Sequence, residues 1–243
     1  MRIRVVNPNT TESMTALIEA SARAVAGPGT VVDAVTAAMG PASIESHYDE
    51  ALAVPGLLAA VADGENAGAD GYVVACFGDP GLDAAREIAA GPVVGIAEAA
   101  MHAATLVGRA FSVVTTLDRT RGRALDLAGR YVAAGACRGV HACDIPVLGL
   151  EGDPGALKRV VEVARSALDR DGSDVIVLGC AGMADLCAAA AAELGVPVVD
   201  GVAAATVLVQ SLITLGLRTS RRGEYARPPG KPYAGLLGGF ATA

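Results

Sequence analysis

The sequence contains an internal repeat, and this repeat limits the folds that the chain can adopt. Three segments recur in the same order at a nearly constant offset. They are 2–11 with 110–119 (offset 108), 71–82 with 175–186 (offset 104) and 91–100 with 196–205 (offset 105). In this register Cys76 falls on Cys180 and Pro92 falls on Pro197. Strands rich in Val and Ala can align by chance, but a cysteine and a proline in register indicate a duplicated unit.

Each copy of the repeat alternates short apolar runs with longer alanine-rich stretches. This alternation predicts parallel strands with helices on both faces of a sheet. We expect strands at 3–6, 31–35, 71–75, 93–95, 110–114, 140–145, 175–178 and 196–199. We expect helices at 11–25, 48–67, 82–90, 97–106, 119–134, 154–169 and 184–194. The predicted fold class is α/β, with two pseudo-symmetric doubly wound domains, each holding a mainly parallel four-stranded sheet.

The repeat also predicts the domain organisation. We expect a first α/β domain over residues 1–100 and a second over 101–205, with the C-terminal segment 206–243 packing back on the first. Ligands of such sheets bind at the carboxyl ends of the strands. Two facing halves would bring their strand ends into one cleft, which places the active site between the domains.

The paired cysteines Cys76 and Cys180 each close a predicted strand and would lie on opposite walls of that cleft. A lone cysteine at a strand end is more often a packing residue, but a pair in register favours chemistry. We expect Asp79 to cap a helix that begins at Pro80, and Gly182 to let the backbone approach a ligand. Helix N-termini favour thiolates and can hold an oxyanion. Two opposed thiols can move a proton from one face of a carbon to the other.

The sequence shows no sign of a cofactor or a metal. It contains neither a phosphate-binding nor a dinucleotide-binding glycine motif. A pyridoxal cofactor needs a lysine, and neither Lys158 nor Lys231 follows a predicted strand. Acidic residues and a histidine crowd residues 45–50, but their spacing matches no usual metal site. We expect that segment to be a solvated helix start, and no cofactor or metal in the reaction.

Composition and charge exclude several other classes. Hydrophobic residues make up 52% of the chain, which is enough to bury a large core. The net charge of −7 and the absence of a basic, aromatic-rich face argue against a nucleic-acid partner. No apolar stretch reaches the roughly 18 uninterrupted residues that a membrane span needs. The N-terminal apolar run is too short for a signal peptide, so we expect a cytoplasmic protein.

Five short segments resemble one family of enzymes. They are NPNTT (7–11), GPASIES (40–46), ACFGDPGL (75–82), TTL (115–117) and LGCAGM (178–183). In this order they are similar to the hydantoin/allantoin racemases of the aspartate/glutamate racemase superfamily, over nearly the whole chain. The resemblance implies a cofactor-independent racemase with a two-cysteine mechanism, a small-molecule ureide substrate and a homo-oligomeric assembly.

The resemblance also implies roles for single residues. Cys76 and Cys180 match the two acid/base cysteines. The substrate-binding positions that it implies are Asn9, Ser43, Ile44, Phe77, Gly78, Thr115, Thr116, Ala181 and Gly182. Amino-acid racemases of the superfamily carry polar residues after each cysteine, where this chain has apolar residues and glycines. This difference favours a neutral or weakly acidic ring, a 5-substituted hydantoin or allantoin.

Two alternative functions stay open at the level of the sequence. An aspartate or glutamate racemase would share the fold and the cysteine pair. A non-catalytic two-lobed binding protein would share the duplicated α/β lobes and the cleft. Arylmalonate decarboxylases of the same superfamily keep only one of the two cysteines, so the pair argues against decarboxylation.

Overall fold

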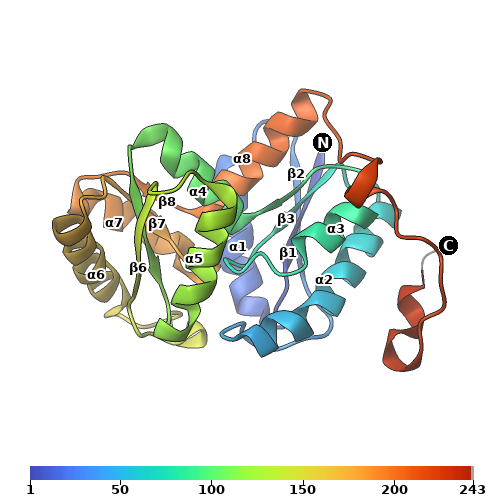
Figure 1. Cartoon of the computed structure of the whole chain (residues 1–243), viewed down its shortest axis with the longest axis horizontal. Helices are drawn as coiled ribbons and strands as arrows, with labels where there is room; N and C mark the ends of the chain where they lie inside the picture. The colour runs from blue at the N-terminus through green and yellow to red at the C-terminus, as the bar shows by residue number, and fades with distance from the viewer. Residues whose placement is uncertain (242–243) are drawn as a thin grey trace.

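The computed structural model describes residues 1–241 and contains two four-stranded sheets (Figure 1). The first sheet has the order β2-β1-β3-β4 and the second the order β6-β5-β7-β8, and every strand pair is parallel. The strands are β1 (Arg2–Asn7), β2 (Val31–Thr36), β3 (Gly71–Val74), β4 (Val93–Gly95), β5 (Phe111–Thr115), β6 (Cys137–Ala142), β7 (Val175–Leu178) and β8 (Val198–Val199). The identical strand order confirms the predicted fold class.

Helices connect and cover the strands. The α-helices are α1 (Glu12–Val25), α2 (His47–Asn66), α3 (Leu82–Ile88), α4 (Ile96–Val107), α5 (Arg121–Tyr131), α6 (Ala156–Asp171), α7 (Cys187–Leu194) and α8 (Gly201–Thr214). Short 3-10 helices are η1 (Asp118–Thr120), η2 (Val147–Gly149), η3 (Ala181–Leu186), η4 (Gly223–Tyr225) and η5 (Gly235–Phe240). Across residues 1–241, none of the helices has the length and apolarity that a membrane crossing requires.

The largest hydrophobic cluster is shared by the two halves, and each half also has a smaller cluster. The central strands β3, β5 and β7 are buried along their whole length, because helices cover both faces of each sheet. Helices α1, α4 and α8 lie between the two sheets (Figure 1), and α8 packs against both α1 and α4. Their apolar side chains form one cluster that joins Ile3 and Val73 of the first sheet to Phe111 and Val177 of the second. This shared core fixes the two sets of strand ends relative to each other.

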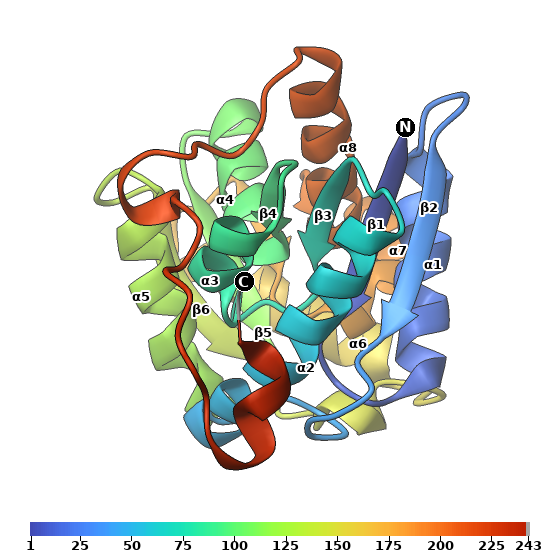
Figure 2. The same cartoon turned by 90° about the vertical axis from the view of Figure 1, so that its right-hand side faces the viewer.

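The C-terminal segment runs back along the first half after α8 (Figure 2). The Thr219 hydroxyl donates to the Gly91 carbonyl at 2.6 Å, and the Arg221 guanidinium donates to the carbonyls of Glu87 and Ala89. The Tyr225 hydroxyl donates at 3.1 Å to the carboxylate of Asp83, which lies on the first turn of α3. These contacts concern residues 219–225. The domain bounds 1–100, 101–205 and 206–243 stay a prediction, and residues 242–243 lie outside the described chain.

Two local predictions are wrong. The strand predicted at 140–145 is β6, which begins three residues earlier because Phe111 pairs with Cys137, and which ends before Asp144 turns to a φ of 55°. Asp79 and Pro80 do not start α3 as its predicted N-cap and first residue: this helix begins at Leu82, the start of the predicted range 82–90, and its N-cap is Gly81 with a φ of 64°. Asp79 itself has a φ of 46° and points away from α3.

Candidate active site

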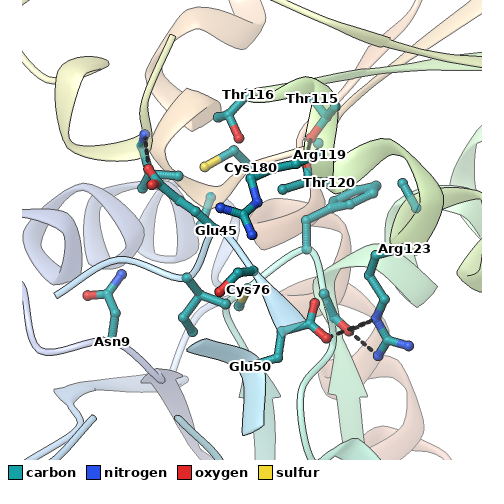
Figure 3. A pocket seen from close by; sticks show the side chains of 18 of the residues that line it. Asn9, Glu45, Glu50, Cys76, Thr115, Thr116, Arg119, Thr120, Arg123 and Cys180 are labelled. Carbon is teal, nitrogen blue, oxygen red and sulfur yellow. Dashed lines mark hydrogen bonds and ion pairs between the residues drawn. The ribbon is translucent and has the colours of Figure 1, made fainter. Parts of the chain in front are cut away.

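Cys76 and Cys180 line the same pocket, which opens between the two sheets at the carboxyl ends of their strands (Figure 3). Cys76 lies two residues beyond β3, and Cys180 lies two residues beyond β7. These strands are equivalent in the two sheets, because each pairs with the first strand of its half and with the last. The duplicated topology therefore places a thiol at the same point of each half.

Most residues that the sequence predicted for the site line this pocket. Those brought together are Asn9, Ile44, Cys76, Phe77, Gly78, Thr115, Thr116, Cys180 and Ala181. Ser43 and Gly182 are not among the lining residues. Gly182 is nevertheless close, because a Cβ atom added to it would lie 3.7 Å from the Cys180 sulfur.

The electrostatics of the thiols differ from the expectation of a stabilised thiolate. Burial raises the pKa of both thiols and is the largest cause of the shift in each case. The pKa of Cys180 is raised to about 11. The backbone amides of Gly78 and Gly182, each two residues after its cysteine, oppose this shift. The charge of Cys180 also raises the pKa of Cys76. Ionisation of one thiol therefore disfavours ionisation of the other, which suits a site with one thiolate and one thiol.

The turn after Cys76 is held by Asp79. Its carboxylate accepts the backbone N–H groups of Ala97 at 3.1 Å and Glu98 at 3.0 Å, so Asp79 caps α4 and not α3. The Tyr131 hydroxyl of α5 donates to the same carboxylate at 3.0 Å. Gly95 makes this contact possible, because a Cβ atom there would overlap the carboxylate. Burial raises the pKa of Asp79 to about 7 against the pull of these three donors.

Helix α2 delivers charged residues to the pocket that the sequence analysis placed in solvent. Ser46 is the N-cap of α2: the Asp49 amide donates to the Ser46 hydroxyl at 3.1 Å, and that hydroxyl donates to the Asp49 carboxylate at 2.7 Å. This cap turns Glu45, His47 and Glu50 toward the pocket, which all three line. The prediction of a solvated helix start is wrong for Glu50, whose side chain is only 19% exposed.

Arg123 of α5, in the second half, contacts two residues of the pocket wall that belong to the first half. Its guanidinium forms an ion pair with Glu50 at 3.3 Å and donates to the Gly78 carbonyl at 2.7 Å. Gly78 leaves room for this ion pair, because a Cβ atom there would overlap the Glu50 carboxylate as it is placed. The pair thus holds the turn after Cys76 against the second half.

Two polar groups of the pocket keep hydrogen-bonding capacity for a ligand. The Asn9 oxygen accepts from the Asn7 amide and from the Thr11 N–H, both at 2.9 Å. The Asn9 amide nitrogen, in contrast, donates within the described residues only to the Met14 sulfur, a weak acceptor. The Thr116 hydroxyl has no hydrogen bond within residues 1–241, whereas that of Thr115 pairs with Thr120 at 2.9 Å. Asn9 and Thr116 can therefore donate to a carbonyl oxygen of a bound molecule.

Two arginines line the pocket that were not predicted from the sequence, Arg119 and Arg123. One signal was available, because η1 and the first turn of α5 carry several arginines where the helix dipole favours acidic residues. Positive charge at such a position indicates a role in binding and not in helix stability.

No metal site is found in the part of the chain that the structure describes. Residues 1–241 contain no group of three or more His, Cys, Asp or Glu side chains that could hold an ion.

The chain has two equivalent α/β halves, and each half places one thiol at the end of the same strand. These features are those of a class of enzymes with two similar halves and a pair of cysteines. The chain belongs to the Asp/Glu/hydantoin racemase family, whose sequence profile matches residues 3–209. It is therefore an isomerase of the racemase type.

Similar proteins narrow the branch of the family. The hydantoin racemase of Rhizobium meliloti is 47% identical over 239 residues, which are 97% of this chain and 98% of that protein. The structure of an allantoin racemase from Klebsiella pneumoniae has a TM-score of 0.96 at 51% identity and covers 99% of both chains. An allantoin racemase structure from Pseudomonas fluorescens has a TM-score of 0.93 at 41% identity, covering 97% of this chain and 100% of that one. The chain is hydantoin racemase-like over its full length.

Proposed function

We propose that the chain racemises 5-substituted hydantoins or allantoin through Cys76 and Cys180. The observation that carries this proposal is that both thiols, from equivalent positions of the two halves, line one pocket. The similar proteins named hydantoin racemase and allantoin racemase support the choice of a ureide ring as substrate.

The reaction moves one proton across the ring carbon C5. The thiolate of one cysteine takes the C5 proton and becomes a thiol, and the electron pair left on C5 moves to the neighbouring carbonyl oxygen. The thiol of the opposite cysteine then gives its proton to the other face of C5 and becomes a thiolate. The product is the mirror-image ring, and the enzyme has exchanged the roles of its two cysteines.

Polar groups of the pocket would stabilise the enolate oxygen that forms on the way. The Asn9 amide has a second N–H besides the one directed at the Met14 sulfur, and the Thr116 hydroxyl has no partner within residues 1–241. Each of the two residues follows the first strand of its half. Donors that are already in place cost no reorganisation when the charge develops. We propose that these two groups hold ring carbonyls and thereby place C5 between the sulfurs.

Hydrogen exchange in deuterated water tests the proposal against its alternatives. A panel of hydantoins, allantoin, aspartate and glutamate is incubated with the enzyme, and the loss of the α-hydrogen signal is followed by NMR. A racemase of ureide rings exchanges C5–H of the rings and leaves the amino acids unlabelled. Exchange of the amino acids alone would support the aspartate/glutamate racemase. A non-catalytic binding protein would exchange none of them.

Three further features belong to this proposal. We propose that the protein works in the cytoplasm and as a homo-oligomer, and that the active site lies between domains 1–100 and 101–205. Size measurement by light scattering tests the second of these points.

A further inference from the structure

The side chain of Arg119 extends from η1 into the pocket. Figure 3 shows its guanidinium directed toward the region between the two labelled cysteines. No hydrogen bond or ion pair of Arg119 occurs within residues 1–241. Neighbouring arginines are occupied, because Arg121 donates to the Val140 carbonyl at 2.7 Å and Arg123 binds Glu50 and Gly78. Arg119 is thus a cation of the pocket wall that is available to a ligand.

Glu45 supplies an acceptor in the same pocket. One of its carboxylate oxygens accepts the Val147 N–H at 2.7 Å, which fixes the side chain across the two halves. The other oxygen has no partner among the described residues. Glu45 is close enough to Cys180 for its charge to act on that thiol. No ion pair joins Glu45 to Arg119 in residues 1–241, so the pocket presents a separate donor and a separate acceptor.

This pair restricts the substituent that a ring can carry at C5. An alkyl or aryl group would displace water from Arg119 and Glu45 without offering either side chain a hydrogen bond. Such a substituent would therefore lower the affinity of the ring. A carboxylate would satisfy Arg119 but meet the negative charge of Glu45, which no ion pair within residues 1–241 offsets. A ureido group has a carbonyl oxygen for the guanidinium and N–H groups for the carboxylate, so it satisfies both.

We propose that Arg119, together with Glu45, makes the enzyme specific for rings with a 5-ureido substituent, and that allantoin is therefore preferred over 5-alkyl and 5-aryl hydantoins. This inference rests on the proposed function and names the substrate within it. Arg119 would contact the exocyclic carbonyl, which takes up no charge when the proton leaves C5. Its loss would therefore change the choice of substrate more than the chemistry.

The test compares kcat/KM for deuterium wash-in on allantoin, 5-benzylhydantoin and 5-(carboxymethyl)hydantoin, after subtraction of exchange without enzyme. We expect the wild type to favour allantoin over both other rings by at least about tenfold, the range of one charge-assisted hydrogen bond. Arg119→Met should lower the ratio of kcat/KM for allantoin to kcat/KM for 5-benzylhydantoin by about tenfold. Arg119→Lys should lower this ratio by less, because a lysine keeps the positive charge but lacks the planar set of N–H donors of a guanidinium. Glu45→Gln should improve the carboxymethyl ring relative to allantoin.

Arg138→Met is the matched control, because Arg138 is an exposed arginine on β6 outside the pocket. It should keep the wild-type ratio. A wild-type preference for 5-benzylhydantoin, or an unchanged ratio in Arg119→Met, would overturn the specificity role and leave the racemase proposal intact. If the wild type exchanges none of the three rings, the proposed function itself fails and the specificity role fails with it.

Discussion

The Tyr131 hydroxyl donates a hydrogen bond to the buried carboxylate of Asp79 at 3.0 Å, and this bond joins the two halves next to a pocket cysteine. Asp79 lies three residues after Cys76 and caps α4, which leads from the first sheet into the second. Tyr131 closes α5 in the second half. The turn that carries Cys76 is therefore positioned by contacts from both halves.

Tyr131→Phe should destabilise the protein and slow racemisation. The substitution leaves a buried carboxylate with one donor fewer, which costs about 1–3 kcal/mol of unfolding free energy. A turn that is held less firmly also misplaces the Cys76 sulfur, so we expect kcat to fall more than KM rises. Urea denaturation and steady-state kinetics measure the two effects.

Tyr225→Phe is the control for this variant. Tyr225 also donates to an aspartate, at 3.1 Å, but that aspartate is Asp83, whose side chain is 47% exposed. Water replaces the lost donor there, so the loss of stability should be smaller. Equal effects of the two tyrosine variants on kcat would argue against a special role of the Asp79 contact.

The raised pKa of Asp79 predicts how stability depends on pH. Burial raises this pKa from 3.8 to about 7 in the folded protein. Between these values the folded state binds more protons than the unfolded state, so the free energy of unfolding falls as pH rises from about 4 to about 7. Asp79→Asn removes this titration.

Urea denaturation at pH 5 and pH 8 measures the effect of Asp79. The wild type should lose more unfolding free energy than Asp79→Asn over this interval. The same loss in both proteins would show that Asp79 does not titrate in this range.

Burial of the thiols predicts a rate that rises with pH. Since the pKa of Cys180 is raised to about 11 and that of Cys76 is also raised, only a small fraction of the free enzyme carries a thiolate at neutral pH. We expect kcat/KM to increase about tenfold per pH unit between about pH 7 and pH 9, because kcat/KM reports the ionisation of the free enzyme. Exchange measured without enzyme is subtracted at each pH. A plateau already at pH 7 would mean that the thiolate forms more easily than burial allows.

Gly78→Ala should reduce activity through its clash with Glu50. A Cβ atom at this position overlaps the Glu50 carboxylate, so either the ion pair with Arg123 or the turn after Cys76 must move. We expect kcat/KM to fall by tenfold or more. Gly122→Ala is the matched control, since no atom lies within 4 Å of its added Cβ and the position is helical. That variant should keep its activity and gain up to about 1 kcal/mol of stability. Wild-type kcat/KM in Gly78→Ala would contradict the prediction.

Much of the fold follows from patterns that are local or repeated. The apolar runs that became β3 and β7 are continuous because both faces of these strands are buried, and the register of Cys76 with Cys180 predicted that the two would share a cleft. Asp79 shows the limit of such reasoning. The dipeptide Asp79-Pro80 is typical of a helix start, but the Asp79 carboxylate caps a helix that begins seventeen residues further on, at Ile96.

The charged residues of the pocket were beyond local patterns for the same reason. Glu45 and Glu50 precede and begin a helix, where acidic side chains are ordinarily solvated. Only the packing of the second half against α2 shows that Glu50 meets Arg123 and that Glu45 meets Val147. Contacts between residues about 70 and 102 positions apart leave no periodic signal in the sequence.

The central claim is that the two thiols act on opposite faces of one carbon, and single-cysteine variants test it most directly. Cys76→Ser and Cys180→Ser are each incubated in deuterated water with the separate enantiomers of 5-benzylhydantoin and of allantoin. We expect neither variant to racemise at a measurable rate. Each should still wash deuterium into one enantiomer, and the two variants should prefer opposite enantiomers, because the remaining thiol reaches one face only. Racemisation at the wild-type rate by either variant, or exchange of the same enantiomer by both, would contradict the account.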